Sequence, residues 1–264
     1  MDGKVLAITS GKGGVGKSTI VSNFGHFLAW KGFKTVILDL DIGLRTLDFI
    51  LGIEEKDIKI DILQLLDNEK ELEKSLIQIK ENKKLYFIAA SDEGDKESLD
   101  ILKLGNLFKI LKKEFDYIVI DSPAGIENGF EKSIQFADEI IITVTPDIFS
   151  IKDANKVINK IIDINEKIDV FLLINKFMPE FASQKDNFEL NTIQQELGIP
   201  LIGVVEFDVK VIKSTNIGKP ICLYKDTKAG EEIRNSVKRY LGTDIPLPKY
   251  SFLDKIKSFF FNKN

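Results

Sequence analysis

Short apolar runs alternate with longer amphipathic segments along most of the chain. The runs are continuously apolar rather than alternating, which is typical of strands covered on both faces of a sheet. The strand candidates are residues 5–10, 35–40, 85–90, 117–121, 139–144, 170–175 and 201–205. Helical periodicity marks the segments 19–30, 98–113, 151–164, 188–197 and 230–241. This order predicts an α/β domain with a mostly parallel sheet and helices on both of its faces.

The last part of the chain departs from this pattern. Residues 242–249 hold two prolines and little apolar pattern, so we expect a linker between a domain at 1–241 and the segment 250–264. At about 100° per residue, five apolar side chains of that segment share an arc of about 120°, as an amphipathic helix requires. They are Phe252, Leu253, Ile256, Phe259 and Phe260, and Phe261 falls outside the arc.

The composition excludes several classes of site. The 264 residues suffice for one sizeable α/β core. A single cysteine, Cys222, and a single histidine, His26, exclude a disulfide framework and a Cys/His zinc site. The first residues lack the apolar stretch of a signal peptide, and no apolar run reaches the length of a transmembrane helix. We therefore expect a protein that is soluble or, at most, peripheral to a membrane.

The net charge of −4 is unevenly distributed. Residues 249–264 carry four lysines and one aspartate, a net charge of +3, so the rest of the chain carries −7. A mildly acidic body of this kind is a poor partner for nucleic acid. We therefore expect no specific nucleic-acid binding.

The first strand candidate is followed directly by GKGGVGKST, residues 11–19, which meets the phosphate-loop pattern G-x-x-x-x-G-K-S. Glycines let main-chain N–H groups close around phosphate oxygens, helped by the positive end of the following helix. Lys17 would reach the β- and γ-phosphates, and Ser18 would offer its hydroxyl to Mg²⁺. The predicted nucleotide-binding residues of this stretch are Gly11, Lys12, Gly13, Gly14, Val15, Gly16, Lys17, Ser18 and Thr19.

Two further segments place carboxylates where a nucleotide hydrolase needs them. DLDIGLRTLD (39–48) ends the second strand candidate, and DSPAGIE (121–127) ends the strand YIVID. A buried strand that terminates in aspartate suits a carboxylate that reaches Mg²⁺ through water, and Asp121 is that candidate. Asp39 and Asp41 alternate by two, so one could lie on the metal side, where we place Asp39, while the other orients the attacking water.

Lys12 is unusual, because an ordinary phosphate loop does not need a second lysine. Two ammonium groups in one small loop repel each other unless a polyanion lies between them. GKGGVGKST resembles the deviant Walker A motif of the ParA/MinD family of ATPases. With DLDIGLRTLD and DSPAGIE it looks like the MinD branch of that family. The resemblance covers the whole chain, from the first strand candidate to the amphipathic end.

This resemblance implies a P-loop NTPase fold that forms a sandwich dimer around two ATP molecules, with Mg²⁺. By similarity, Lys12 would reach the partner's nucleotide, and Asn175 in FLLINKF would read the adenine edge. Asp41 would position the hydrolytic water, and Asp121 would be the Walker B carboxylate. The implied catalytic residues are thus Lys12, Lys17, Asp41 and Asp121.

The implied output is placement of the division septum by slow ATP hydrolysis at the inner face of the cytoplasmic membrane. The partners would be a MinC-like division inhibitor and a MinE-like or other topological regulator. Lys255 and Lys257 flank the apolar arc and could reach anionic head groups. Burying each large apolar side chain in the lipid contributes roughly 1.5–3 kcal/mol of binding free energy. The entropic cost of ordering the tail largely offsets that gain. One tail should therefore bind weakly, and two tails on an ATP dimer should bind through effective concentration.

The sequence departs from the family pattern at three places. Thr46 stands where the family has asparagine, and Glu206 and Phe207 stand where a proline is expected near the base. The adenine contacts around Glu206–Asp208 therefore stay open. Phe130, after DSPAGIE, is bulkier than expected, so partner contacts near it could differ.

Three other interpretations compete with this one. A ParA-type partitioning ATPase would need a basic surface, for which only Arg234, Lys238 and Arg239 cluster, while a FlhG-type flagellar-number relative shares the amphipathic tail. An iron–sulfur scaffold of this fold needs a C-x-x-C pair, and Cys222 stands alone. The tail could also dock on its own domain.

Overall fold

A single eight-stranded sheet organises the chain. The computed structural model describes residues 2–94, 96–126, 129–179 and 190–250. The strands are β1 (Lys4–Thr9), β2 (Thr35–Asp39), β3 (Ile77–Gln78), β4 (Leu85–Ile88), β5 (Tyr117–Asp121), β6 (Glu139–Val144), β7 (Asp169–Phe177) and β8 (Leu201–Glu206). Their order in the sheet is β3-β4-β2-β5-β1-β6-β7-β8, and every pair is parallel except β3 with β4. The predicted mostly parallel α/β sheet is confirmed.

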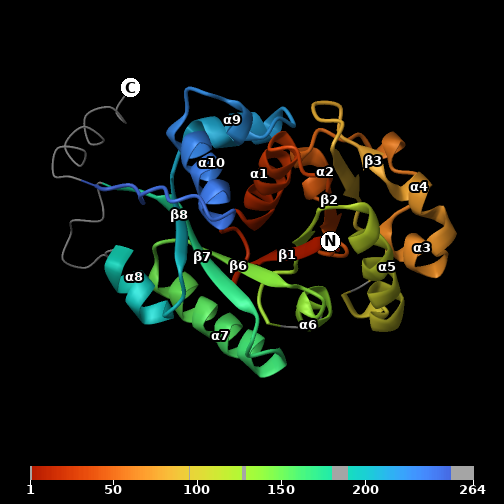
Figure 1. The fold of residues 1–264 in the computed structure, drawn as a ribbon, viewed down its shortest axis with the longest axis horizontal. Coiled ribbons are helices and arrows are strands. Elements are labelled where there is room, and N and C mark those ends of the chain that lie inside the picture. The colour runs from red at the N-terminus through yellow and green to blue at the C-terminus, as the bar shows by residue number, and fades with distance from the viewer. Residues whose placement is uncertain (1, 95, 127–128, 180–189, 251–264) are drawn as a thin grey trace.

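Helices cover both faces of this sheet (Figure 1). They are α1 (Lys17–Trp30), α2 (Leu47–Ile50), α3 (Ile62–Asp67), α4 (Leu72–Ser75), α5 (Ile101–Glu114), α6 (Phe130–Ile134), α7 (Ile148–Ile164), α8 (Leu190–Leu197), α9 (Val209–Asn216) and α10 (Lys228–Tyr240). Single 3₁₀ turns occur at Glu55–Asp57, Glu69–Glu71, Lys96–Ser98 and Ile221–Leu223. The five predicted helices correspond to α1, α5, α7, α8 and α10.

Successive side chains of the strands point to opposite faces, and this divides the core in two. In β1, Val5 and Ala7 belong to the core cluster that includes side chains of α3, α5, α7 and α8, whereas Leu6 and Ile8 belong to the cluster that includes α1, α2 and α10. Because both faces are buried, central strands need apolar residues at every position, which explains the continuous runs in the sequence. None of the helices in the described ranges is both long enough and apolar enough to cross a membrane.

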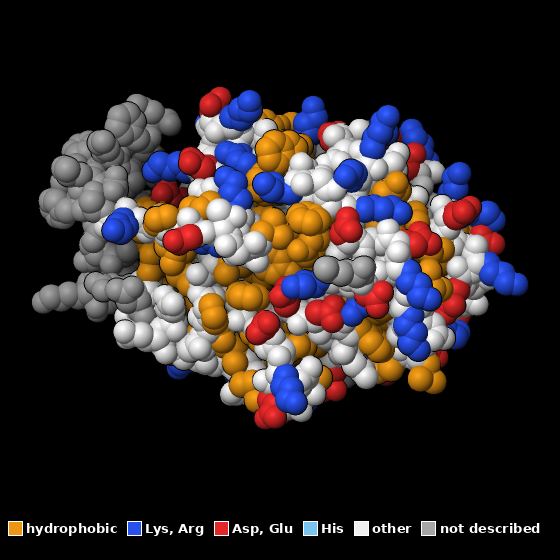
Figure 2. Space-filling model, in the orientation of Figure 1, with side chains coloured by type: hydrophobic (Ala, Val, Ile, Leu, Met, Phe, Trp, Pro, Cys, Tyr) orange, Lys and Arg blue, Asp and Glu red, His pale blue; other side chains and the backbone are white. Residues whose placement is uncertain are grey.

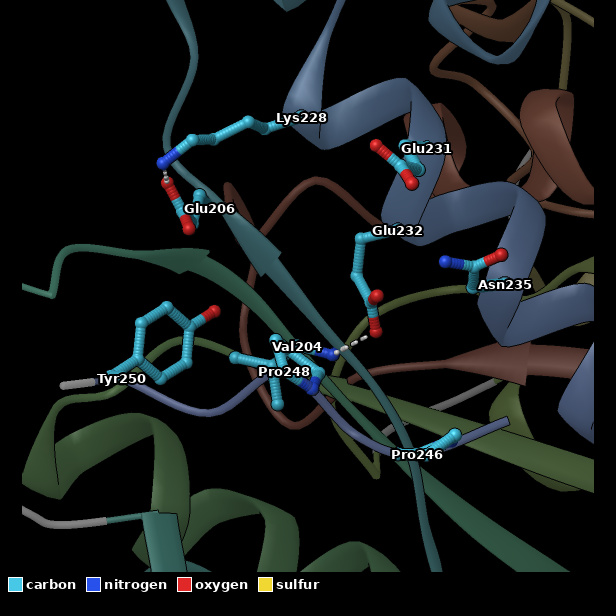
Figure 3. Close-up of a pocket in the computed structure, with 9 residues that line it drawn as sticks. All are labelled: Val204, Glu206, Lys228, Glu231, Glu232, Asn235, Pro246, Pro248 and Tyr250. Carbon is cyan, nitrogen blue, oxygen red and sulfur yellow. Dashed lines mark hydrogen bonds and ion pairs between the residues drawn. The ribbon is translucent and has the colours of Figure 1, made fainter. Parts of the chain in front are cut away.

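Residues 243–250 contain neither helix nor strand and lie against the domain. The Arg239 guanidinium, at the end of α10, donates to the carbonyl oxygens of Ile245 and Pro246, both at 2.7 Å. The Tyr250 ring packs on Phe177, with 4.7 Å between ring centroids. Pro246, Pro248 and Tyr250 line a pocket of about 230 Å³ together with residues of β8 and α10. Figure 3 draws these lining residues. The predicted amphipathic residues Phe252, Leu253, Ile256, Phe259 and Phe260 lie outside the described residues.

Arg239 also protects the outer edge of β8. Its guanidinium donates to the Ile202 carbonyl at 2.9 Å and pairs with Glu232 at 2.7 Å. Glu232 in turn accepts from the Val204 N–H at 3.2 Å, as drawn in Figure 3. An exposed strand edge is a template for pairing with other chains, and these two side chains occupy one acceptor and one donor of this edge. The arginine therefore ties the sheet edge, α10 and residues 245–246 together.

We expect Arg239→Ala to lower the free energy of unfolding by about 3 kcal/mol, because it leaves the nearly buried Glu232 carboxylate without its cation. Urea denaturation of the nucleotide-free protein measures this loss. Lys238→Ala is the matched control, since the Lys238 ammonium contacts the Asn235 side chain at 3.3 Å on the same helix. Equal stability of the two variants would contradict the proposed role of Arg239 at this edge.

Candidate phosphate-binding site

The glycine-rich stretch forms a loop between β1 and α1, at the carboxyl end of the strand in the middle of the sheet. Gly16 precedes α1 with φ = 93°, in the left-handed region that favours glycine. A Cβ on Gly16 would lie 2.4 Å from the Asn175 side-chain nitrogen, and a Cβ on Gly11 would lie 2.5 Å from the Asp153 main chain. Loop conformation and close packing therefore both require glycine here.

The first turn of α1 is open to an anion. Within the described part of the chain, no side chain caps this helix, and its first turn holds no acidic residue. The free N–H groups and the helix dipole give such an end a partial positive charge. Ser18 and Thr19 lie in this turn, directly after the loop. A phosphate group placed here would meet main-chain donors on several sides.

Lys17 lies among the strand-end carboxylates. Its ammonium is hydrogen-bonded to Asp121 and lies 3.7 Å from the Asp41 carboxylate. Asp39 and Asp121 are opposite each other in the register of β2 and β5, and both are buried. The ends of two neighbouring strands and the start of α1 thus bring together four of the residues that we predicted from the sequence.

Burial shapes the charge balance of this group. It raises the pKa of Asp39 well above its usual value, and the nearby Asp121 carboxylate raises it further. Burial also raises the pKa of Asp121, against the opposing effect of Lys17. For Lys17, burial lowers the pKa, but Asp121, Asp41 and Asp39 outweigh it and leave the pKa raised. Lys17 is therefore held as a cation, and the acidic residues around it compete for that one positive charge.

The oxygen donors of the site suit Mg²⁺ together with phosphate. Ser18 follows Lys17 in the first turn of α1, and its hydroxyl lowers the pKa of Asp121, against the effect of burial. In the ranges that the structure describes, no three Asp, Glu, His or Cys side chains are grouped so that they could hold a metal ion. Mg²⁺ commonly binds one or two carboxylates and completes its shell with water and substrate phosphate. The residues present fit that mode of binding.

Lys12 has a different acidic partner from Lys17. Its ammonium lies 3.0 Å from each carboxylate oxygen of Asp147, which caps the start of α7. Burial raises the pKa of Asp147, but hydrogen bonds from Thr145, Ser150 and Lys12 outweigh it and leave that pKa lowered. Asp147 is 135 residues from Lys12 and carries no motif of its own, so the sequence does not mark it as part of the site. The two lysines of the loop thus have separate acidic partners.

Asn175 and its neighbour contact the loop itself. The Asn175 side-chain amide donates to the Val15 carbonyl at 2.8 Å, and the Lys176 ammonium donates to the Gly14 carbonyl at 2.6 Å. Asn175 is thus positioned on the loop main chain, and its expected contact with adenine stays a prediction. No sequence motif marks Lys176 as a contact of the loop.

The three departures from the family pattern lie in different settings. Thr46 precedes α2 and makes no side-chain capping bond to it. Glu206 ends β8 and pairs with Lys228 at 3.3 Å. Phe130 is fully buried in the core, so its bulk fills the interior rather than a surface.

Comparisons with known proteins identify the family. A family profile described as an AAA domain matches residues 3–174. The chain is 38% identical over 267 residues to the septum site-determining protein MinD of Helicobacter pylori, covering 97% of this chain and 98% of that protein. It is 36% identical over 265 residues to the MinD of Bacillus subtilis, covering 98% of each.

Solved structures show the same fold. The MinC:MinD cell division protein complex of Aquifex aeolicus matches with a TM-score of 0.86 and 36% identity, over 94% of this chain and 100% of that chain. The MinD of Pyrococcus horikoshii, complexed with Mg-ADP, matches with a TM-score of 0.78 over 92% of this chain and 99% of that chain. At 23% identity, the second likeness supports the fold alone.

We expect Gly16→Ala to lower the free energy of unfolding by about 2 kcal/mol, because an alanine there is strained and its Cβ meets Asn175. Gly13→Ala is the control in the same loop, since a Cβ on Gly13 meets no atom within 4 Å. Thermal unfolding of the nucleotide-free protein compares them. If Gly13→Ala is as unstable as Gly16→Ala, then the close contact with Asn175 is not what makes glycine necessary.

Proposed function

The chain belongs to the MinD family of septum site-determining proteins, and from this premise we propose that it is a dimerising ATPase that places the division septum. The observation that carries the proposal is the buried Lys17 ammonium, held among Asp39, Asp41 and Asp121 directly after the glycine-rich loop. A cation and a set of loop amides bind the polyphosphate, and the carboxylates remain for the metal and the water.

The phosphate chain binds to the loop amides, the open end of α1 and the Lys17 ammonium. In the described state Lys17 is paired with Asp121, so ATP competes with that carboxylate for the lysine. Ser18, Asp39 and Asp121 would hold Mg²⁺, Asp121 through water. When bound, Mg²⁺ neutralises charge on the phosphate oxygens. Release of Asp121 from Lys17 frees the carboxylate for the metal side.

Asp41 orients the water that attacks the terminal phosphate. Its side chain is partly accessible, unlike those of Asp39 and Asp121, and it follows β2 at the edge where the phosphates bind. Lys12 acts on the nucleotide of the partner subunit. In the single chain Asp147 holds its ammonium, and about a third of each side chain is exposed, so a polyphosphate can replace the aspartate. Dimerisation then completes two sites at once.

The ATP dimer recruits a MinC-like division inhibitor, in keeping with the relative from Aquifex aeolicus that was solved as a MinC:MinD complex. We propose that residues 250–264 bind anionic lipid at the inner face of the cell membrane, and that a MinE-like or other topological factor regulates hydrolysis. Two weak tails on one dimer give a firm attachment, and hydrolysis reverses it. Asn175 is the candidate for contact with adenine.

A ParA-type or FlhG-type positioning ATPase is the alternative, and two observations disfavour the DNA-binding form. Arg239 and Arg234, from the basic cluster in α10, donate to main-chain carbonyls of the same domain, which reduces what they can offer to a phosphate backbone. Figure 2 shows acidic and basic side chains interspersed over the face that it draws, rather than a uniformly basic area. The curated relatives named above are MinD proteins.

Vesicle sedimentation tests the membrane step of this proposal. With a non-hydrolysable ATP analogue, the full chain should pellet with anionic phospholipid vesicles, and with ADP it should stay in the supernatant. Phe260→Glu should abolish pelleting because it puts a charge in the apolar arc, whereas Phe261→Glu, outside the arc, should pellet like the unmodified protein.

The variant Lys12→Ala tests whether membrane binding requires dimerisation as well as the tail. This variant keeps both the tail and Lys17, so it should bind nucleotide but remain monomeric in size-exclusion chromatography and fail to pellet. The proposed membrane switch would be contradicted if the unmodified protein pelleted equally with and without nucleotide. It would also be contradicted if Phe260→Glu and Phe261→Glu lost pelleting to the same extent.

A further inference from the structure

The end of β7 is bent in a way that its sequence does not require. Lys176 has φ = 55°, and among the described residues other than glycine no other φ is positive. The bend lies inside β7, where the pairing register with β8 shifts between Ile174 and Phe177. A side chain in this region of the backbone is strained, and strain of this kind persists only where the surroundings maintain it.

The bend turns two neighbouring side chains toward the phosphate loop. The Lys176 ammonium donates to the Gly14 carbonyl at 2.6 Å, and the Asn175 amide donates to the Val15 carbonyl at 2.8 Å. The two acceptors belong to consecutive residues of the loop, and the two donors are consecutive in β7. An extended strand would send successive side chains to opposite faces, so the left-handed residue is what lets both reach one loop.

These contacts matter because the loop works through its main chain. For its N–H groups to face a phosphate, its carbonyl groups must face away, and those carbonyl groups then need donors of their own. Asn175 and Lys176 supply two of these donors from the outer side of the loop. Lys176 adds a positive charge there, and a hydrogen bond from a charged donor is about twice as strong as a neutral one.

We propose that Lys176 is a positioning residue for the phosphate loop, which it holds, with Asn175, in the conformation that binds nucleotide. The inference rests on the proposed function, since it concerns ATP binding at that same site. It assigns Lys176 no contact with the reacting phosphate. Its effect should fall on the affinity for ADP and ATP alike, because both carry the phosphates that the loop surrounds, and not on the hydrolytic step.

The test is the dissociation constant for fluorescent ADP and ATP analogues, together with KM and kcat, in the full-length protein. Lys176→Ala keeps the strained backbone and removes the ammonium. It should weaken binding of both nucleotides about tenfold, the size expected for one charge-assisted hydrogen bond, with kcat unchanged. Lys176→Arg should restore affinity, because a guanidinium group can donate to the same carbonyl. Lys176→Gly relieves the backbone but should bind as weakly as Lys176→Ala.

Lys103→Ala is the matched control, since the Lys103 ammonium on α5 pairs with Asp67 of α3 at 2.8 Å and contacts no residue of the loop. It should bind both nucleotides normally. Unchanged affinity in Lys176→Ala, loss of ATP affinity alone, failure of arginine to rescue, or a fall in kcat at constant KM would each overturn the inference. Failure of the unmodified protein to bind ATP would instead refute the proposed function, so the two failures are distinguishable.

Discussion

The site depends on one buried ammonium group and the carboxylates that neutralise it. Lys17 can be buried as a cation only because Asp121 and Asp41 lie beside it, and these come from the ends of β5 and β2. This requirement connects the sheet to the chemistry, because β2, β5 and β1 must be neighbours in the observed order for the three residues to meet. In the function that we propose, nucleotide binding is an exchange of partners, in which phosphate would replace a carboxylate on Lys17 and the freed carboxylate would face the metal.

Residues from other elements contact the phosphate loop around this lysine. Asp153 packs against Gly11, Asn175 and Lys176 bind two loop carbonyls, and Asp147 holds Lys12 to one side. These contacts come from α7 and β7, so the loop is supported by elements that follow it in sequence by more than a hundred residues. Preorganisation of this kind spares the cost of ordering the loop when ligand arrives. The Tyr250 ring packs on Phe177, which is next to Lys176 in β7. The start of the C-terminal segment therefore lies near the residues that contact the loop.

Much of the fold was predictable, because strands buried on both faces must be apolar throughout. All seven predicted strands are present, while β3, with two residues, is too short to leave a pattern. Helices α2, α3, α4, α6 and α9 were missed because segments of four to eight residues depend on tertiary packing rather than on periodicity. That Lys17, Asp39, Asp41 and Asp121 lie together was predictable, because they follow strand ends that meet at one edge of the sheet. Their roles toward nucleotide, and that of Ser18, stay predictions. The partners of Lys12 and Asn175 were not predictable, since nothing local marks contacts across 135 and 160 residues.

The most direct test is the free energy of unfolding of Lys17→Met without nucleotide, measured at pH 7 and pH 5 beside the unmodified protein. Asp39 and Asp121 have raised pKa values even with the lysine present, and loss of its charge raises them further. The folded variant therefore takes up protons that the unfolded chain does not bind until lower pH. We expect a deficit of about 3 kcal/mol at pH 7, and a smaller deficit at pH 5. A variant as stable as the unmodified protein at pH 7, or a deficit that grows toward pH 5, would contradict this account.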